Sequence, residues 1–565
     1  MTSISVCICA AVRPAERQDN GRHDAVTADQ LAGPRRLSPS GAPMTSDPPG
    51  GRTEQPAGTL AEEERLWELR SGLARNPALP ASLVEHLTAL GDASVWLELA
   101  DRDDLSGDQI RLLARCGDAQ VVIRLLSRGL LPPDEVDRFD PPVVIAMADI
   151  APIPEDWAWR LAASPDPAIR GALAATTHLP ADIVAALADD PDLEVVAEAA
   201  GSPRISDTLA ERLATHPHLI VRRALACNEH VPSHLLVALA ERRAPAAELC
   251  PACDGSGHCL AKHWSCDGRH QDALHDLDYA LTLNPRTPAE TVSRFTGHPS
   301  IHVRWRLAVR TDLPQSAYRA LAQDPTPGVR GDVAANPAID EALIRAMADD
   351  TIYDVRRRLA HNPAVPLDVL TELAASAKIG PNLLPRIAAA TPAEISDLAA
   401  STVPAVRMLL AARHDLPRQI IDQLAGDRDA KVLTSLAANP ALREAQLWTM
   451  VAAHGPRVAA KAAGNPSCPP DLLMQLAQQT PPVHRALRRI AAHPNAPAEA
   501  LLACLSDEQA RRIAASHPAL PAQTIIQLLS DADTTVAAAA AANPSLPEAV
   551  MHDLAASDDG STGTR

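Results

Sequence analysis

The stretch Asp354–Ala374 reads DVRRRLAHNPAVPLDVLTELA, and degenerate copies of it recur along most of the 565-residue chain. After Pro366, apolar residues stand at offsets of three, four, seven and eight, which places them on one face of a helix. A second apolar stripe, from Val355 to Leu359, ends before Asn362-Pro363, because proline disfavours the α conformation of the preceding residue. One repeat is therefore predicted to be two short helices joined by turns.

The copies follow one another at a nearly fixed period, marked by the residue that precedes the second helix of each repeat. Pro154 and Pro180 are 26 residues apart, as are Pro80 and Ser106. The marks are Pro80, Ser106, Pro132, Pro154, Pro180, Ser206, Pro232, Pro288, Pro314, Asp340, Pro366, Pro392, Pro417, Arg443, Pro469, Pro497, Pro521 and Pro547. Self-similarity on this scale is typical of a solenoid, in which each repeat buries its apolar face against its neighbours. The fold class is therefore predicted to be all-α, with about 26 residues to each two-helix repeat.

The period divides the chain into segments. Residues 1–59 are rich in Pro, Gly, Ser and charged residues without a period, which predicts disorder, and Met44 is a candidate for the natural start. Repeats are expected at 60–245 and 271–555, a cysteine-rich nodule at 246–270, and a disordered tail at 556–565. The helix that begins near Leu60 is expected to cap the array. Peptides upstream of Met44 in the native protein would exclude that start.

Composition limits the function classes. A net charge of -18 and an aromatic content of 2% disfavour a nucleic-acid partner, which needs basic surfaces and stacking platforms. The apolar run Ile4–Val12 lacks a basic flank and is too short to cross a bilayer, so neither an export signal nor membrane association is expected. Cysteines outside the nodule show no framework spacing, which favours a reducing, cytoplasmic location.

The pattern VRxxLAxNPxLPxxLLxxLA, nearly intact from Val355 to Ala374, resembles the leucine-rich repeat variant family over roughly residues 70–555. This resemblance implies a right-handed superhelix of alternating α and 3₁₀ helices, and some members carry a small iron-sulfur domain held by cysteines. Asp324, followed by Val329-Arg330, is also similar to HEAT repeats, which are built from paired α-helices.

The nodule carries four thiols in CPACDGSGHCLAKHWSC. They belong to Cys250, Cys253, Cys259 and Cys266. This stretch lacks the aliphatic face of a repeat, and a Cys₄ metal centre could supply the missing folding energy. Free thiols or a disulfide are the alternatives, and His258, His263 and His270 are candidate substitute ligands. Since the marks Pro232 and Pro288 are 56 residues apart, the nodule is predicted to replace one repeat within the stack.

Two metals remain open for this centre. The spacing from Cys250 to Gly257, CxxCxGxG, resembles one zinc-binding knuckle of DnaJ-type chaperones. The family resemblance instead implies a [4Fe-4S] cluster, which also takes four thiolates. Structural stapling of the array is preferred to redox sensing, because no bistable element that a sensor needs can be identified.

Arginine recurs at one position of the first helix, and stacking would align these side chains in a column. They are Arg170, Arg222, Arg304, Arg330, Arg356 and Arg407. The column could bind acidic ligands, but pairing with acidic residues of the preceding turn, such as Asp324 before Arg330, is preferred. A contiguous basic surface unmatched by aspartate would reverse that preference. The seven Asn-Pro pairs are interpreted only as helix terminators, without chemistry.

No GxSxG, P-loop, GxGxxG or HExxH motif is found in the sequence, so no catalytic activity is predicted. The leading hypothesis is a cytoplasmic scaffold whose elongated concave face binds another protein, as is usual for helical solenoids. An iron-sulfur redox or sensory protein that uses the same repeats is the second hypothesis, and a DNA-binding solenoid the third. The buried position expected for Leu359 predicts that Leu359→Ala costs about 2–5 kcal/mol.

Overall fold

The computed structural model describes residues 57–136, 138–241 and 271–556, and the chain separates into the units Met1–Glu64 and Arg65–Arg565. Every regular element in these described ranges is a helix. The prediction of an all-α repeat protein is therefore confirmed. The predicted nodule and the predicted termini fall mainly outside the described residues, and their segment boundaries stay predictions.

Each repeat contributes one helix to an inner row and one to an outer row. In the repeat quoted above these are α20 (Tyr353–Leu359) and α21 (Leu367–Ser376). Pro366 stands directly before α21 with φ -60° and ψ 146°, and its carbonyl accepts a 2.9 Å hydrogen bond from the Leu370 amide. A proline carbonyl thus begins the helix although the proline has no N–H to satisfy. Val355 and Leu359 are fully buried and Leu373 is 2% exposed, as the apolar stripes predict.

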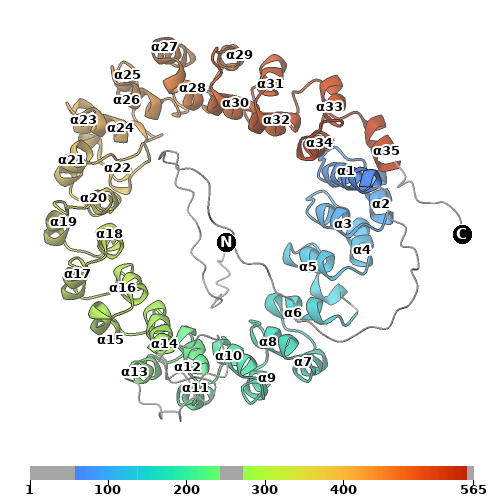
Figure 1. Ribbon diagram of the computed structural model, residues 1–565, viewed down its shortest axis with the longest axis vertical. Helices are drawn as coiled ribbons and strands as arrows, with labels where there is room; N and C mark the ends of the chain where they lie inside the picture. Colours follow the sequence, from blue (N-terminus) through green and yellow to red (C-terminus); the bar gives the residue numbers. More distant parts are fainter. Residues whose placement is uncertain (1–56, 137, 242–270, 557–565) are drawn as a thin grey trace, which may run out of the picture. The chain divides into compact units, whose positions relative to one another are not determined.

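Figure 1 shows the two rows following one another along the chain. The inner row consists of α3 (Ala93–Ala100), α5 (Ala119–Ser127), α6 (Pro141–Ile150), α8 (Pro167–Ala174), α10 (Leu193–Gly201), α12 (Leu219–Cys227), α14 (Gln271–Leu283), α16 (Ile301–Ala308), α18 (Pro327–Ala335), α20, α22 (Pro385–Ala388), α24 (Pro404–Ala411), α26 (Ala430–Leu436), α28 (Pro456–Ala462), α30 (His484–Ala491), α32 (Glu508–Ala515) and α34 (Thr534–Ala541). The outer row consists of α2 (Ala81–Ala89), α4 (Gly107–Ala114), α7 (Glu155–Ala162), α9 (Ala181–Leu187), α11 (Asp207–Ala214), α13 (Ser233–Ala240), α15 (Ala289–Ser293), α17 (Gln315–Leu321), α19 (Glu341–Met347), α21, α23 (Pro392–Ala400), α25 (Arg418–Ala425), α27 (Glu444–His454), α29 (Pro470–Ala477), α31 (Ala498–Cys504), α33 (Ala522–Leu528) and α35 (Glu548–Ala556). Neighbouring inner helices contact one another more extensively than neighbouring outer helices, so the array curves toward the inner row.

The alternation of α and 3₁₀ helices that the family resemblance implies is wrong for this chain. In the described residues, 3₁₀ helices occur only at η1 (Pro133–Glu135) and η2 (Arg294–Gly297). Both helices of a typical repeat are α-helical. Aspartate stabilises the N-termini of many inner helices as the N-cap residue. Asp192 caps α10 by accepting a hydrogen bond from the Glu194 backbone amide.

The asparagines of the Asn-Pro pairs join each repeat to the one before it. The side-chain Nδ2 of Asn362 donates hydrogen bonds of 2.9 and 2.7 Å to the backbone carbonyls of Ala334 and Asn336. Its Oδ1 accepts one from the backbone N–H of Ala364. The interpretation of these pairs as terminators without further chemistry is therefore incomplete. Paired bonds of this kind are also made by Asn76, Asn228, Asn284, Asn336, Asn465 and Asn543. We call the residue at this position the ladder residue.

Other donors take the ladder position in some repeats. Arg102 donates to the carbonyls of Ala74 and Asn76, and His493 is within 2.9 Å of the Asn465 carbonyl. Asn, Arg and His can therefore each supply a buried donor aimed at the preceding repeat.

The repeats before and after the cysteine-rich segment are direct neighbours in the stack. Asn284 donates to the carbonyls of Ala226 and Asn228 at 2.8 and 2.9 Å, and α14 packs on α12. The two repeats therefore meet in the ordinary register, rather than being separated by one replaced unit as the spacing predicts. The extra residues form an insertion between adjacent repeats.

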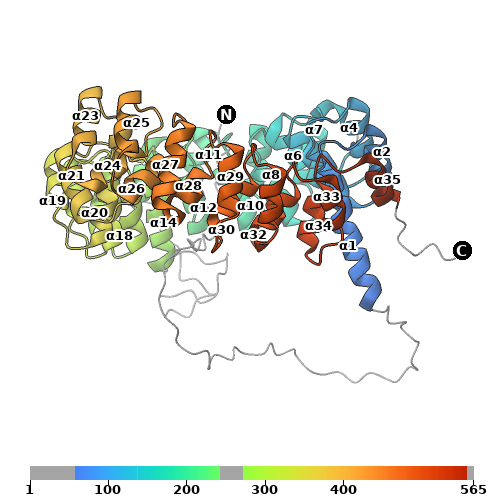
Figure 2. The ribbon, with the colours of Figure 1, turned by 90° about the horizontal axis from the view of Figure 1, so that it is seen from above.

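Within the unit Arg65–Arg565, the first repeat packs against the last. Asn76 donates to the carbonyls of Ala541 and Asn543 at 3.0 and 2.7 Å, the same pattern that joins consecutive repeats elsewhere. The His86 ring lies 3.2 Å from the Ala555 carbonyl, and α35 lies beside α2 in both Figure 1 and Figure 2. The expectation that the first helix caps an open array is wrong, because α1 (Ala57–Ala74) contributes its last turns to this seam.

Gly72 lets the two helices of the seam approach closely. A Cβ at this position would lie 2.2 Å from the carbonyl oxygen of Ala538 in α34. Facing it, α34 has the sequence TTVAAAAA, whose small side chains keep the helices close. No helix of the described residues is long and apolar enough to cross a membrane.

Candidate functional site

The predicted metal ligands Cys250, Cys253, Cys259 and Cys266 lie outside the described residues, as do His258, His263 and His270. The predicted centre is therefore not tested by the structure. Within the described ranges, no group of three or more His, Cys, Asp and Glu side chains is placed to hold a metal ion.

Four other cysteines lie in the described repeats outside any disulfide: Cys116, Cys227, Cys468 and Cys504. Cys468 and Cys504 are fully buried in the core. Burial disfavours the thiolate and raises the pKa of each to about 12. These two cysteines are core residues without nucleophilic character.

The arginine column serves the stack itself, although its carboxylate partner differs from the predicted one. Arg330 donates from Nε and Nη2 to both oxygens of Asp350, at 2.8 and 3.1 Å, and Asp350 belongs to the following turn. Its Nη1 donates to the backbone carbonyl of Asp324, at 2.9 Å. The prediction of an Arg–Asp ladder is thus right in kind, but the aspartate of the preceding turn contributes its backbone and not its carboxylate.

The same bidentate pair recurs three more times in the described residues, as Arg170–Asp190, Arg304–Asp324 and Arg407–Asp427. Hydrogen bonds from Arg170 and Arg330 hold the pKa of Asp190 and Asp350 below its usual range. Residue 376, the position corresponding to the aspartate of Arg356, is serine, and that of Arg222 lies outside the described residues. Most of this column is therefore neutralised within the stack.

A different set of side chains lies on the side of the inner row that is directed away from the outer row. On each inner helix, the positions eight and four residues before the ladder residue lie on one face, because residues four apart are neighbours on a helix. This face is opposite the buried apolar positions, so it is directed away from the outer row. We call it the inner face.

The inner face of three consecutive helices carries only basic charge. Lys431, Arg457 and Arg485 occupy the first position on α26, α28 and α30, and Lys461 and Arg489 occupy the second on α28 and α30. All five are exposed, and no carboxylate in the described part of the chain forms an ion pair with any of them. We call these five residues the cationic arc.

Elsewhere on the inner face, Arg306 of α16 is an isolated basic residue without an ion pair among the described residues, and the other arginines are paired. On α20, Arg358 pairs with Asp332 of α18 and with Asp354, and Arg357 also pairs with Asp354. On α10 the two positions are glutamates, Glu194 and Glu198. The inner face is thus segregated by charge, and the cationic arc is its positive section.

The cationic arc is held on a well-packed base. The aliphatic stem of Arg489 crosses the end of α28, where a Cβ on Gly464 would lie 3.5 Å from its Cδ. Behind it, Asp507 engages His484 at 2.7 Å and Arg488 at 3.8 Å. The neighbouring Arg488 is therefore already committed to a carboxylate, whereas Arg485 and Arg489 on the same helix are not.

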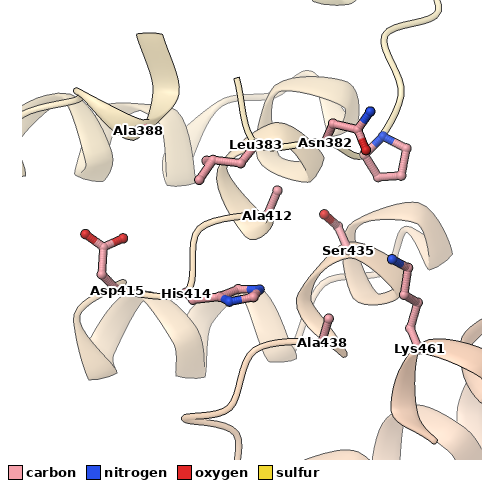
Figure 3. Close-up of a pocket in the computed structure, with 10 residues that line it drawn as sticks. Asn382, Leu383, Ala388, Ala412, His414, Asp415, Ser435, Ala438 and Lys461 are labelled. Carbon is pink, nitrogen blue, oxygen red and sulfur yellow. The ribbon is translucent and has the colours of Figure 1, made fainter. Parts of the chain in front are cut away.

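A pocket of about 530 Å³ adjoins the cationic arc (Figure 3). Its lining is Pro381, Asn382, Leu383, Ala388, Ala412, His414, Asp415, Ser435, Ala438 and Lys461. Lys461 stands at one side of it, next to Ser435, which takes the equivalent position on α26 (Figure 3). The pocket is mainly apolar on the side of Leu383 and polar on the side of Lys461. It can hold an apolar side chain beside a negatively charged group.

Sequence reasoning missed the cationic arc, although a signal for it exists. Lys431 and Arg457 are 26 residues apart, and Arg457 and Arg485, like Lys461 and Arg489, are 28 apart. Aligning the repeats on Asn439, Asn465 and His493 would have placed all five in two columns. The column of recurrent arginines that the sequence displays is the more regular one, and its members pair with aspartates within the stack.

Comparison with known proteins finds a likeness among solved structures. No model of a known protein family matches the chain, and no curated protein matches it. Among solved structures, the chain is similar to one described as "a leucine-rich repeat variant with a novel repetitive protein structural motif". The identity is 20%, the match covers 46% of this chain and 87% of that chain, and the TM-score is 0.26.

Proposed function

We propose that the protein is a non-catalytic binding scaffold whose inner face engages another protein. One observation carries the proposal. The arginines of the Arg–Asp pairs are neutralised within the stack, whereas the cationic arc is exposed and unpaired among the described residues. Charges that contribute nothing to the stack are available for a partner. A cytoplasmic location belongs to the same proposal, since it suits cysteines that form no disulfide in the described repeats.

Site-specific crosslinking tests the scaffold function. A photo-activated amino acid replaces Gln509, which is exposed on the inner face of α32, or Gln475, which is exposed on α29 of the outer row. Crosslinked species from native lysate are expected at Gln509 and not at Gln475. The absence of crosslinks at the inner face, or equal crosslinking at both positions, would contradict the proposal.

A second candidate function uses the four cysteines of the inserted segment. Thiols at Cys250, Cys253, Cys259 and Cys266 fall within one short stretch and form a donor set that suits Zn²⁺ or a [4Fe-4S] cluster. Such a centre would hold the insertion folded between two adjacent repeats, or make partner binding sensitive to oxidation. Metal analysis of the purified protein tests this candidate.

A further inference from the structure

We infer that the cationic arc is the docking surface for a short acidic segment of the partner protein. The inference rests on the proposed scaffold function and adds the chemistry of the partner. It is carried by the geometry of Lys431, Arg457, Lys461, Arg485 and Arg489, by the absence of a carboxylate pairing with them in the described residues, and by the pocket beside them.

The placement of four of these five charges costs stability in the isolated protein. Arg457 and Lys461 are four residues apart on α28, and so are Arg485 and Arg489 on α30. Like charges at this spacing repel each other and destabilise a helix. On α20 the equivalent positions hold the oppositely charged Asp354 and Arg358, which pair with each other, but α26, α28 and α30 contain no acidic residue. An anionic ligand across the two columns would relieve this repulsion.

The extent of the arc sets the length of the segment. The first column stops at Ala405 on α24 and at Gln509 on α32, so the positive surface covers three inner helices. Packed helices lie about 8–10 Å apart, so the arc spans roughly 20 Å. An extended chain rises about 3.3 Å per residue, which corresponds to a segment of roughly six to eight residues.

The pocket adds an apolar contact at one end of this segment. Lys461 belongs to both the arc and the pocket, and Leu383 and Ala412 lie across from it (Figure 3). A carboxylate on Lys461 therefore places the neighbouring side chain of the segment at the pocket. The expected ligand is an acidic peptide with one apolar residue near its end, running from α26 toward α30.

The arc fits a peptide better than a nucleic acid. The three helices carry no Phe, Tyr or Trp side chain on which a base could stack. A longer phosphate backbone would also continue past the arc onto α24 and α32, where Ala405 and Gln509 offer no positive charge, in a chain with a net charge of -18. A short acidic peptide needs no surface for base stacking and does not extend beyond the arc.

Fluorescence anisotropy with the full-length protein tests this docking surface. The probe is a labelled ten-residue peptide that contains six glutamates and one leucine. Its binding is expected to weaken as NaCl is raised, and the double variant K461E/R489E is expected to weaken it at least tenfold. Replacing the leucine of the peptide with glycine should weaken binding several-fold, since the pocket then stays empty.

The variant is designed so that lost binding does not reflect unfolding. Glutamate at position 461 stands four residues after Arg457, and glutamate at 489 four residues after Arg485, so both substitutions replace repulsion with attraction. The thermal midpoint should be unchanged or higher. The matched control R204E/R306E makes the same change in net charge at two arginines outside the arc, and it should bind the peptide within twofold of the wild type.

Each contrary result overturns a defined part of the inference. Equal loss of binding in K461E/R489E and in the control would show attraction to net charge rather than docking on the arc. Tighter binding of a single-stranded DNA of equal charge than of the peptide would overturn the assignment to an acidic peptide. No binding of the peptide, together with crosslinks at Gln509, would overturn this inference and leave the scaffold function standing. No peptide binding and no crosslinks would overturn both.

Discussion

The side-chain amide of Asn76 donates a 2.7 Å hydrogen bond to the backbone carbonyl of Asn543, 467 residues further along the chain. Asn543 makes the equivalent bond to His517 of its own preceding repeat, at 2.9 Å. The register across the seam is therefore the register within the array. The first and last repeats pair as if they were consecutive, and the chain closes with neither end of the ladder left open.

Gly72 is predicted to be required for this closure. Gly72→Ala would place a methyl group 2.2 Å from the Ala538 carbonyl oxygen, which is backbone and cannot rotate away. The seam must then widen, at a cost of about 1–3 kcal/mol that is typical of overpacking. Spin labels at Glu85 of α2 and Glu548 of α35 should report a longer, broader distance distribution than in the wild type.

Gly201 provides the matched control for this substitution. Gly201 is the last residue of the inner-row helix α10. A Cβ at this position would meet no atom within 4 Å. Gly201→Ala should leave the distance distribution unchanged. A seam that stays closed in Gly72→Ala, with unchanged stability, would contradict the close approach of α1 and α34.

The ladder asparagines are predicted to contribute to stability in proportion to the hydrogen bonds that they make. Asn362 is fully buried and makes three hydrogen bonds to backbone groups of two repeats. Asn362→Ala leaves buried carbonyls without this donor, so the free energy of unfolding should fall by about 2–3 kcal/mol. Urea unfolding measures the change. Asn382→Ala, at an exposed asparagine, should alter it by less than about 0.5 kcal/mol.

The periodic part of the fold could be predicted from the sequence, and the contacts across repeats could not. The apolar stripes of Val355, Leu359 and Leu373 depend on local spacing, which a single sequence displays. The partner of Arg330 depends on how one repeat stacks on the next, so spacing along the chain pointed to the carboxylate of Asp324, whereas Arg330 pairs with that of Asp350. Closure was not predictable either, because nothing near Gly72 identifies Ala538 as its neighbour.

The pairing of Arg330 with Asp350 predicts a pH dependence of stability. Hydrogen bonds from Arg330 lower the pKa of Asp350 in the folded protein below the value of about 3.9 expected when unfolded. The stabilisation is therefore complete above the unfolded pKa and is lost as the pH falls through the folded pKa. Asp350→Asn should reduce the free energy of unfolding at pH 7 by about 1.5–3 kcal/mol, and the deficit should shrink below about pH 4.

Asp349 is a suitable control for that titration, because it is adjacent in sequence but exposed. Urea unfolding of Asp349→Asn should match the wild type at pH 7 and at pH 3. A deficit in Asp350→Asn that is as large at pH 3 as at pH 7 would mean that the carboxylate charge does not stabilise the stack.

The cysteines of the inserted segment are predicted to behave differently from those of the core. Cys468 and Cys504 are fully buried, with pKa values raised to about 12, so iodoacetamide at pH 8 should not modify them in the folded protein. If Cys250, Cys253, Cys259 and Cys266 bind a metal, they should become reactive after chelation or oxidative loss of the metal, without exposure of the two core thiols. Mass spectrometry of the labelled peptides distinguishes this from free thiols, which react at once, and from a disulfide, which reacts only after reduction.

A brown absorbance with iron would identify a cluster, and a colourless protein with one zinc would exclude it. Cys253→Ser with Cys259→Ser should lower the thermal midpoint of the adjacent repeats, and unchanged melting would exclude a structural role.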